Sequence, residues 1–345
     1  MPEGPTGAAE PLASLPEGAR VPAETGPHER TLVVWPTSSR REQLWGDQLD
    51  AARDVHALVA HAIARFEPVL LVVDPADEDT AVKHIDSDAI ELLTEPVDDS
   101  WLRDSGPVTA VALDGTRRAL CFRFTGWGGS FTPYDRDATI AARLARHLGF
   151  VSYDVGIAGE GGALALDGDG IVVTTERCLL NPNRNPGRTR AEIDAALLRA
   201  TGADTVVWLA DGIAEDAGTD GHVDNVVAFH APGRCLLQGC ADPANPNHAI
   251  AAASRATLER CGIDVTEVPV LPYATVGGVR VPVPYVNLSP VNGAVLVPIA
   301  GDPADPSMLE LISACYPDRD VIGVPGAVLA FGGGGVHCIT QPVPV

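Results

Sequence analysis

The sequence lacks the features that mark membrane, secreted and disulfide-stabilised proteins. It contains no run of about 18 consecutive apolar residues, so no segment is predicted to span a bilayer. Its first residues include no basic stretch followed by an apolar one, as a secretory signal would. The seven cysteines are odd in number and irregularly spaced, which predicts neither a disulfide framework nor a paired Cys-x-x-Cys zinc site. We therefore expect a globular protein of the cytoplasm with no membrane partner.

Positive charge is also scarce. Lys83 is the only lysine, and 24 basic residues face 46 acidic ones, which gives a formal net charge of -22 at pH 7. Such a surface repels the phosphates of nucleic acids, and no basic stripe offsets the repulsion. The charge balance excludes a nucleic-acid partner and favours a small cationic ligand, such as a guanidinium or an amine.

Signatures of bound cofactors are missing as well. The sequence has no Gly-Lys-Ser/Thr for a phosphate-binding loop, and Gly159-Glu-Gly-Gly162 does not open a helix as a dinucleotide-binding loop would. His56 and His61 lie on a predicted helix five residues apart, which is the wrong spacing for a shared metal. We predict no cofactor and no metal ion.

The chain alternates between segments typical of strands and segments typical of helices. Residues 1–28 are rich in Pro, Gly, Ala and Glu without apolar periodicity, so we predict a disordered leader followed by a single domain over residues 29–345. Turn signals between several strands, such as Asp114-Gly115, favour locally antiparallel pairs, and the length accommodates about five strand-rich units with one helix each. Strands are predicted near residues 31–35, 69–73, 108–113, 119–124, 171–175, 205–209, 225–230, 234–238 and 294–298, and helices within 42–66 and near 137–149, 189–201, 245–262 and 306–315.

Two distant segments carry the parts of a thiol-based site. A run of four glycines, Gly332–Gly335, precedes Cys338, which we expect to lie on a short apolar strand. His222 and Asp224 are two positions apart, so in an extended strand both side chains would lie on one face. Cys, His and carboxylates together can perform nucleophilic catalysis. Because neighbouring strand residues face opposite sides, we expect His337 to point away from the site.

Each of these residues also has a purely structural explanation. Asp104, in a segment closed by Gly-Pro, could cap a local turn, and Glu160 could be a solvated turn carboxylate. His222 could be a hydrogen-bonded core histidine, and Cys338 a small buried apolar residue. The glycine run weighs against the last explanation, because so flexible a backbone usually allows a ligand to approach closely.

Taken together, eight segments resemble the agmatine deiminase and bacterial peptidyl-arginine deiminase family, within the superfamily of guanidine-modifying enzymes. They occur in the family's order and span nearly the whole chain from residue 27. The matching segments are Pro27-His-Glu-Arg30 with Trp35-Pro36, Asp99–Pro107, Trp127-Gly-Gly129, Glu160-Gly-Gly162, Leu179–Pro186, Gly221–Asn225, Val291-Asn-Gly293 and Gly332–Gln341.

The resemblance implies a fold class and a set of residue roles. The fold would be an α/β propeller with five blades, the pentein fold, with its site at the end of the central channel. Cys338 would be the nucleophile, His222 the general acid and base, and Asp104 with Asp224 the pair that binds the guanidinium. The residues expected to line or support the substrate pocket are Glu160, Asn292, Trp101 and Trp127, although Trp127 could equally belong to the core.

The implied activity is hydrolysis of agmatine to N-carbamoylputrescine and ammonia through a covalent cysteine intermediate, by a monomer or a homo-oligomer. Alternatives are a deiminase of free or peptidyl arginine, an amidinotransferase, and a catalytically silent binding protein with the same fold. The sequence departs from the family's usual residues at Thr25, Leu32, Pro342 and the acidic segment 215–221, which leaves the substrate less defined than the reaction.

Overall fold

The N-terminal segment differs from its predicted disorder. A computed structural model describes residues 9–345, and residues 1–8 of the predicted leader lie outside the described residues. From Glu10 onward the segment packs on the domain, where β1 (Glu10–Pro11) pairs with β7 (Val151–Ala158). The Val21 amide donates to the Thr201 carbonyl at 2.8 Å. An extended segment such as this one takes its hydrogen bonds from neighbouring elements, so its own sequence carries no periodic signal.

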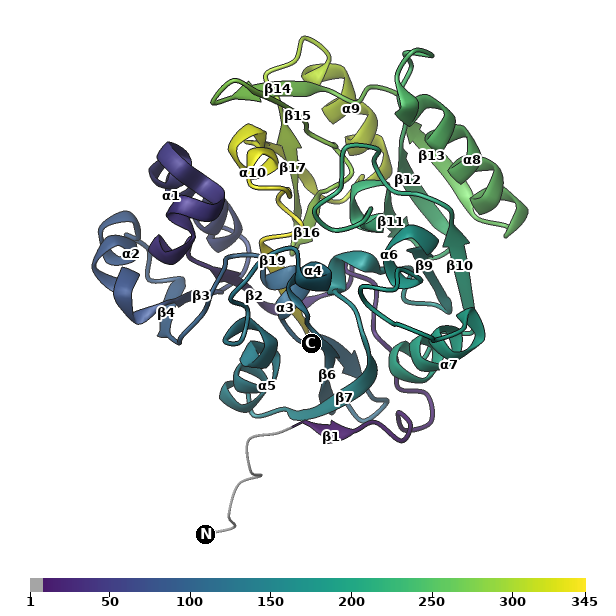
Figure 1. Cartoon of the computed structure of the whole chain (residues 1–345), viewed down its shortest axis with the longest axis horizontal. Coiled ribbons are helices and arrows are strands. Elements are labelled where there is room, and N and C mark those ends of the chain that lie inside the picture. Colours follow the sequence, from purple (N-terminus) through teal and green to yellow (C-terminus); the bar gives the residue numbers. More distant parts are fainter. Residues whose placement is uncertain (1–8) are drawn as a thin grey trace.

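Six separate sheets are present among residues 9–345, and none of them closes on itself (Figure 1). The smallest is the hairpin of β14 (Tyr273–Val276) and β15 (Val279–Pro282). In strand order, the other sheets are β1, β7, β6 (Arg117–Arg123) and β5 (Val108–Val111); β10 (Thr205–Leu209), β9 (Ile171–Thr175) and β8 (Ala165–Leu166); β11 (Val227–Ala231), β12 (Arg234–Gln238) and β13 (Asp264–Val268); β16 (Ser289–Val291), β17 (Ala294–Ile299) and β18 (Asp320–Pro325); and β19 (Thr340–Pro344), β2 (His28–Val34), β3 (Val69–Val73) and β4 (Ile90–Thr94).

A common unit recurs in these larger sheets. Two strands pair antiparallel, a long helix follows, and a further strand adds in parallel, as in β17, α9 (Asp305–Cys315) and β18. This arrangement confirms the predicted alternation and the antiparallel pairs. The long helices lie at the periphery of the molecule, as does α2, whereas the short helices α3, α4 and α6 lie nearer its centre (Figure 1). The other long helices are α1 (Leu49–Ala64), α5 (Asp137–His147), α7 (Arg190–Thr201) and α8 (Pro246–Arg260), and the shorter ones are α2 (Glu78–His84), α3 (Leu102–Ser105), α4 (Gly126–Gly129), α6 (Glu176–Leu179) and α10 (Ala327–Phe331).

The two ends of the chain complete one sheet together. Strand β19, near the C-terminus, pairs antiparallel with β2, near the N-terminus, with Thr340 opposite Val33. Both faces of β2 are buried, because Val33 packs in one apolar cluster with α1 and Leu32 packs in another with α5. Strands covered on both faces read as continuous apolar runs, as residues 31–35 do. This pairing fixes the position of the segment that carries Cys338.

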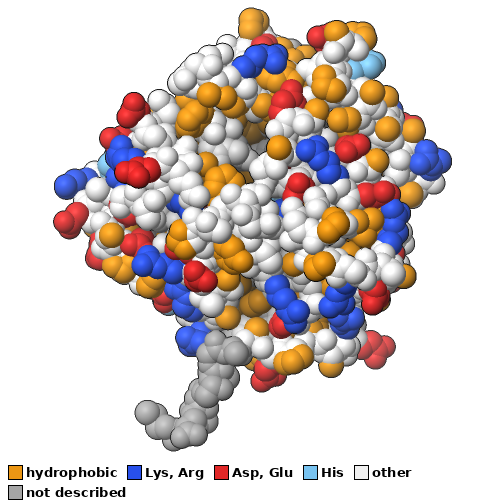
Figure 2. Space-filling model, in the orientation of Figure 1, with side chains coloured by type: hydrophobic (Ala, Val, Ile, Leu, Met, Phe, Trp, Pro, Cys, Tyr) orange, Lys and Arg blue, Asp and Glu red, His pale blue; other side chains and the backbone are white. Residues whose placement is uncertain are grey.

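The surface carries charges of both signs. On the face drawn in Figure 2, the Lys and Arg side chains are scattered among Asp and Glu side chains and form no continuous basic patch. Among the described residues, no helix combines the length and the apolar character that a membrane crossing requires.

Candidate active site

Cys338 lies in a turn that leads into β19, so the predicted strand at this position is wrong. The glycine run between α10 and this turn is required by close packing. A Cβ atom at Gly335 would lie 2.3 Å from Asn287 Oδ1, and one at Gly334 would lie 2.6 Å from the ring of Trp101. The glycines therefore let the backbone lie directly against the side chains that surround the thiol.

The Cys338 thiol is buried among polar groups. Its Sγ atom lies 3.4 Å from Asp224 Oδ2 and 3.2 Å from Asn287 Nδ2. Burial, together with the carboxylates of Asp224 and Asp104, raises the pKa of the thiol well above its ordinary value. The thiol is therefore protonated in the ligand-free protein, and a nearby positive charge would favour the thiolate.

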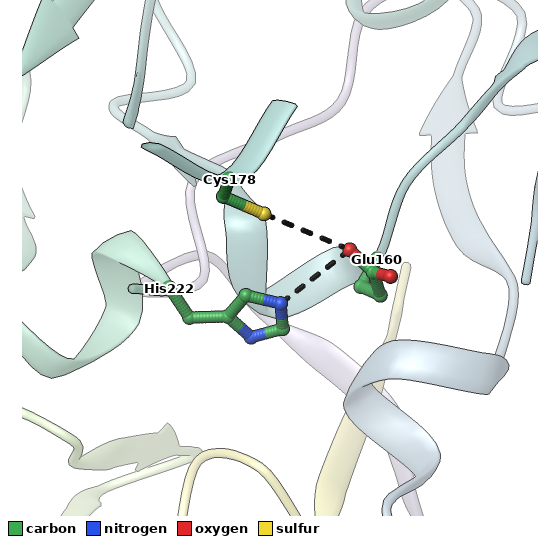
Figure 3. Close-up of side chains that lie close together, drawn as sticks. All are labelled: Glu160, Cys178 and His222. Atoms are coloured by element: carbon green, nitrogen blue, oxygen red, sulfur yellow. Dashed lines mark hydrogen bonds and ion pairs between the residues drawn. The ribbon is translucent and has the colours of Figure 1, made fainter. Parts of the chain in front are cut away.

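His222 and Asp224 belong to a tight turn and not to the predicted strand. A short 3-10 helix covers Val223–Asn225, and His222 precedes it in extended conformation. His222 Nδ1 lies 3.6 Å from Asp104 Oδ1, and its Nε2 lies 3.5 Å from Glu160 Oε2 (Figure 3). Burial alone would lower the pKa of His222, but the Asp104 carboxylate and the adjacent Cys178 and Glu160 side chains raise it well above the ordinary value. The buried imidazole is therefore protonated at neutral pH.

Asp104 lies in α3 and is the least compensated carboxylate of the site. It accepts hydrogen bonds from Trp127 Nε1 at 2.8 Å and from the Gly162 amide at 3.0 Å. Burial raises its pKa to about 6, since the attraction of His222 is opposed by the carboxylates of Asp224 and Glu160. A cation bound here would supply the missing positive charge.

Two tryptophans line the cavity over these groups. Trp101 and Trp127 border it together with His222 and Cys338, and Trp101 stacks on Trp45 at 5.8 Å between ring centroids. Trp127 has a positive φ of 54°, which costs roughly 1–3 kcal/mol in a residue other than glycine. This strained conformation aims the indole nitrogen at Asp104.

Glu160 forms an ion pair with His222. Arg184 is fully buried, and its Nε donates to Glu160 Oε1 at 2.7 Å. Cys178, on α6, lies 3.8 Å from the other carboxylate oxygen (Figure 3). Burial alone would raise the pKa of Glu160, but His222 and Arg184 lower it. Glu160 is therefore ionised and can orient the protonated imidazole.

His337 contacts the site, contrary to the expectation that it points away. Its Nδ1 lies 3.0 Å from Asp224 Oδ2, and its Nε2 lies 2.9 Å from Glu24 Oε2. Glu24 is paired in turn with Arg103 at 2.5 Å. The argument from strand faces fails because residues 336–339 form a turn, in which neighbouring side chains need not oppose each other. Asp224 is thus held between the thiol and a buried imidazole.

The structure brings together every predicted site residue except Asn292. Asn292 Nδ2 donates to the His28 carbonyl at 2.8 Å, its Oδ1 accepts from the His28 amide, and its own amide donates to Glu67, so it links loops outside the cavity. Asn287, which was not predicted as a site residue, lies beside Cys338 instead. Its signal in the sequence is one polar residue between the apolar Val286 and Leu288, in a segment that matches none of the motifs.

Known proteins are similar to this chain over nearly its whole length. Residues 20–344 match the family model described as Porphyromonas-type peptidyl-arginine deiminase. The agmatine deiminase of Pseudomonas putida strain F1 is 36% identical over 360 residues, which cover 95% of this chain and 97% of the relative. That of Stutzerimonas stutzeri is 35% identical over 371 residues, covering 96% and 98%. The solved agmatine deiminase of Enterococcus faecalis has a TM-score of 0.92 at 28% identity and covers 98% of this chain and 99% of its own.

The chain therefore belongs to the Porphyromonas-type peptidyl-arginine deiminase family. Its mixed α/β fold has structural neighbours in the pentein superfamily.

A first prediction concerns the pairing of His337 with Asp224 and Glu24. The pKa of His337 is raised above 6.5, whereas those of Asp224 and Glu24 are lowered below 3.8 and 4.5. The stabilisation is therefore complete between about pH 4.5 and 6.5, declines below that range as the carboxylates take up protons, and declines above it as the pH passes the raised pKa of His337. We expect His337→Gln to lower the free energy of unfolding by about 3 kcal/mol in this window.

Urea unfolding of wild type and variant from pH 4 to pH 9 measures this difference. His61→Gln is the control, because His61 pairs with the exposed Asp86 and such surface pairs contribute about 0–1 kcal/mol. A destabilisation by His337→Gln that is below 1 kcal/mol, or that does not vary with pH, would contradict the proposed charge pairing.

Proposed function

We propose that this protein is an agmatine deiminase, which hydrolyses agmatine to N-carbamoylputrescine and ammonia. The observation that carries the proposal is the convergence of three polar atoms beside Cys338. A Cβ atom at Gly162 would lie 2.7 Å from Asp104 Oδ1, 2.7 Å from His222 Nδ1 and 2.9 Å from Asp224 Oδ2. Two carboxylates and an imidazole grouped this closely, next to a thiol, suit a planar guanidinium.

Binding and activation of the nucleophile are coupled by charge. The guanidinium donates paired hydrogen bonds to Asp104 and Asp224, which hold its central carbon over Cys338 Sγ. Its positive charge offsets the two carboxylates that keep the thiol protonated, so the pKa of Cys338 falls when substrate is bound. Asp224 Oδ2, 3.4 Å from Sγ, is the nearest acceptor for the thiol proton. The reactive thiolate thus forms when a cation is in place.

The reaction then proceeds in two steps. Cys338 Sγ bonds to the guanidinium carbon, His222 gives a proton to one nitrogen, and the bond from carbon to that nitrogen breaks to release ammonia. The remaining S-alkylthiouronium is attacked by water, which passes a proton to His222. The carbon–sulfur bond then breaks to give the Cys338 thiolate, the remaining hydroxyl proton passes to solvent, and the neutral ureido product leaves. Glu160 and Arg184 keep the imidazole oriented throughout.

Relatives support agmatine as the substrate, and one feature of the structure supports arginine derivatives as the alternative. A second cavity adjoins the site through Asn225 and Gly333 and is bordered by Glu215, Asp216 and Arg280. The two carboxylates suit the terminal amine of agmatine, whereas Arg280 suits the carboxylate of arginine. An amidinotransferase would need an amine in place of water, and a silent binding protein would not need the thiol.

The finer description of the fold is also part of this proposal. Within residues 9–345, the sheets with three or four strands are the five blades of an α/β propeller, with the site at the centre. Support comes from the recurring unit of two antiparallel strands, a helix and a parallel strand, and from the peripheral position of the long helices (Figure 1). Residues 29–345 then form one domain, to which the segment from Glu10 is added.

Location and assembly are proposed from the same chemistry. A cytoplasmic location is supported by the free state of all seven cysteines, each of which lies in the described part of the chain. The substrate is a small guanidino cation. Association into a homo-oligomer and the absence of a nucleic-acid partner remain predictions.

A screen for ammonia release tests the proposed function. We expect agmatine to be turned over with the highest kcat/KM among agmatine, free arginine, methylated arginines, guanidinobutyrate and peptides ending in arginine. Cys338→Ser should be folded and inactive, because a hydroxyl has too high a pKa to act as the thiolate does. Preferred turnover of an arginine derivative would show that agmatine is not the main substrate. An active Cys338→Ser variant would contradict the proposed thiolate mechanism.

A pH profile tests the role of Asp104. Because its pKa is about 6 in the free protein, kcat/KM for a cationic substrate should fall as the pH drops below about 6. Trp127→Phe removes the hydrogen bond to the ionised carboxylate, which is worth about 0.5–1.5 kcal/mol, and should move this acid limb upward by about 0.4–1 pH unit.

Trp101→Phe is the matched control, since the Trp101 ring lines the same cavity and its indole nitrogen makes no hydrogen bond to the Asp104 carboxylate. It should lower kcat/KM without moving the limb. An acid limb that stays in place in Trp127→Phe, or moves equally in both variants, would assign this ionisation to another group.

A further inference from the structure

A buried cluster beside the proposed catalytic histidine has the donor set of a metal site. Glu160 Oε2 lies 3.8 Å from Cys178 Sγ and 3.5 Å from His222 Nε2, and the three donor atoms all lie within 4.8 Å of one another (Figure 3). Carboxylate, thiolate and imidazole ligands on a tetrahedral zinc ion are separated by about 3.3–3.6 Å, as follows from bond lengths of about 2.0–2.3 Å. The separations of Glu160 from Cys178 and from His222 are within a few tenths of an ångström of those values.

One donor atom of this cluster is held only loosely. His222 Nε2 is buried, makes no hydrogen bond of ordinary geometry in the described part of the chain, and faces the Glu160 carboxylate in an ion pair of 3.5 Å (Figure 3). Cys178 is equally buried and plays no part in the proposed reaction. His222 also lines the substrate cavity, so an ion entering that cavity reaches the cluster beside it.

We propose that Glu160, Cys178 and His222 bind a thiophilic divalent cation, of which Zn²⁺ is the best match, and that its binding inhibits the enzyme. The inhibition rests on the proposed function, whereas the binding does not. A thiolate with an imidazole and one carboxylate favours Zn²⁺ or Co²⁺ over Mg²⁺ and Ca²⁺, which prefer oxygen ligands alone.

One divalent ion can replace two protons in this cluster without changing its net charge, despite the nearby Arg184. The ion-free cluster holds one negative carboxylate, a neutral thiol and a protonated imidazole. When the ion binds, Zn–S, Zn–N and Zn–O bonds form, while Cys178 and His222 each release one proton to solvent. Two positive charges enter and two leave, so Arg184 experiences the same net charge before and after. His222, now neutral and coordinated through Nε2, cannot deliver a proton to the leaving nitrogen.

Cobalt binding to Cys338→Ser tests the site without relying on activity. This variant removes the other buried thiol of the site and keeps the cluster. We expect Co²⁺ to produce thiolate-to-metal charge-transfer absorption and the visible bands of four-coordinate cobalt, with release of about two protons per ion, and we expect Zn²⁺ to displace it. The affinity should fall by about 100-fold per unit of decreasing pH while both ligands are protonated.

Cys178 is then replaced in the same background. Cys178→Ala should abolish the charge-transfer band and weaken Zn²⁺ binding by at least about 100-fold, with Cys178→Ser as a second variant of nearly the same volume. Cys235→Ala is the control, because Cys235 is buried in β12 outside the cluster and should change nothing. In enzyme that retains Cys338, Cys178→Ala should raise the Zn²⁺ concentration for half inhibition at least tenfold.

Two results would overturn the proposal. One is the absence of the charge-transfer band from folded Cys338→Ser at millimolar Co²⁺. The other is an undiminished band in both Cys178 variants, which would place the ion on other ligands. Zinc inhibition that does not change in Cys178→Ala would assign the inhibition to Cys338. A protein that binds Co²⁺ as expected but releases no ammonia from any substrate would retain the metal site and lose the proposed function.

Discussion

The burial of several carboxylates around one small volume is the constraint on which this structure depends. Asp104, Asp224 and Glu160 are almost completely removed from solvent, and an isolated charge in such a place costs several kcal/mol. Arg184 neutralises Glu160, and His337 neutralises Asp224. Asp104 has only His222 and two hydrogen-bond donors. The site is therefore short of positive charge where a guanidinium would bind, and the groups that need that charge also hold the thiol protonated.

The compensating groups come from parts of the chain that are far apart. Glu24, in the segment before β2, contacts His337, which lies 313 residues later, and the pairing of β2 with β19 holds both ends in register. Arg103 adds a further link, since its amide donates to the Cys338 carbonyl. The pairing of the two chain ends therefore also holds the charged groups of the site together. A change that weakens the pairing of β2 with β19 also exposes these buried charges to solvent.

Glycine residues and one strained backbone conformation also shape the site. Gly332, Gly334 and Gly335 stand where a Cβ would meet Asn287 or an indole ring, and Gly162 stands where a Cβ would meet the converging polar atoms. The positive φ of Trp127 directs its nitrogen to Asp104. These positions lower intrinsic stability, and they are tolerated because the surrounding apolar clusters determine the backbone. Strain and close approach both concentrate at the site.

The alternation of strands and helices could be predicted from the sequence, because apolar periodicity is a local property. The motifs were enough to single out Cys338, His222, Asp104, Asp224 and Glu160. The strands predicted at His222 and Cys338 are wrong, because both residues lie in turns. The few residues that flank each position are compatible with an extended segment and with a tight turn alike. The contacts of Asn287, Glu24 and His337 with the site, and the position of Asn292 outside the cavity, became visible only in the tertiary structure. Those roles depend on contacts between segments that are 50 to more than 300 residues apart. No local pattern encodes such contacts, because burial and charge pairing are settled only when the sheets come together.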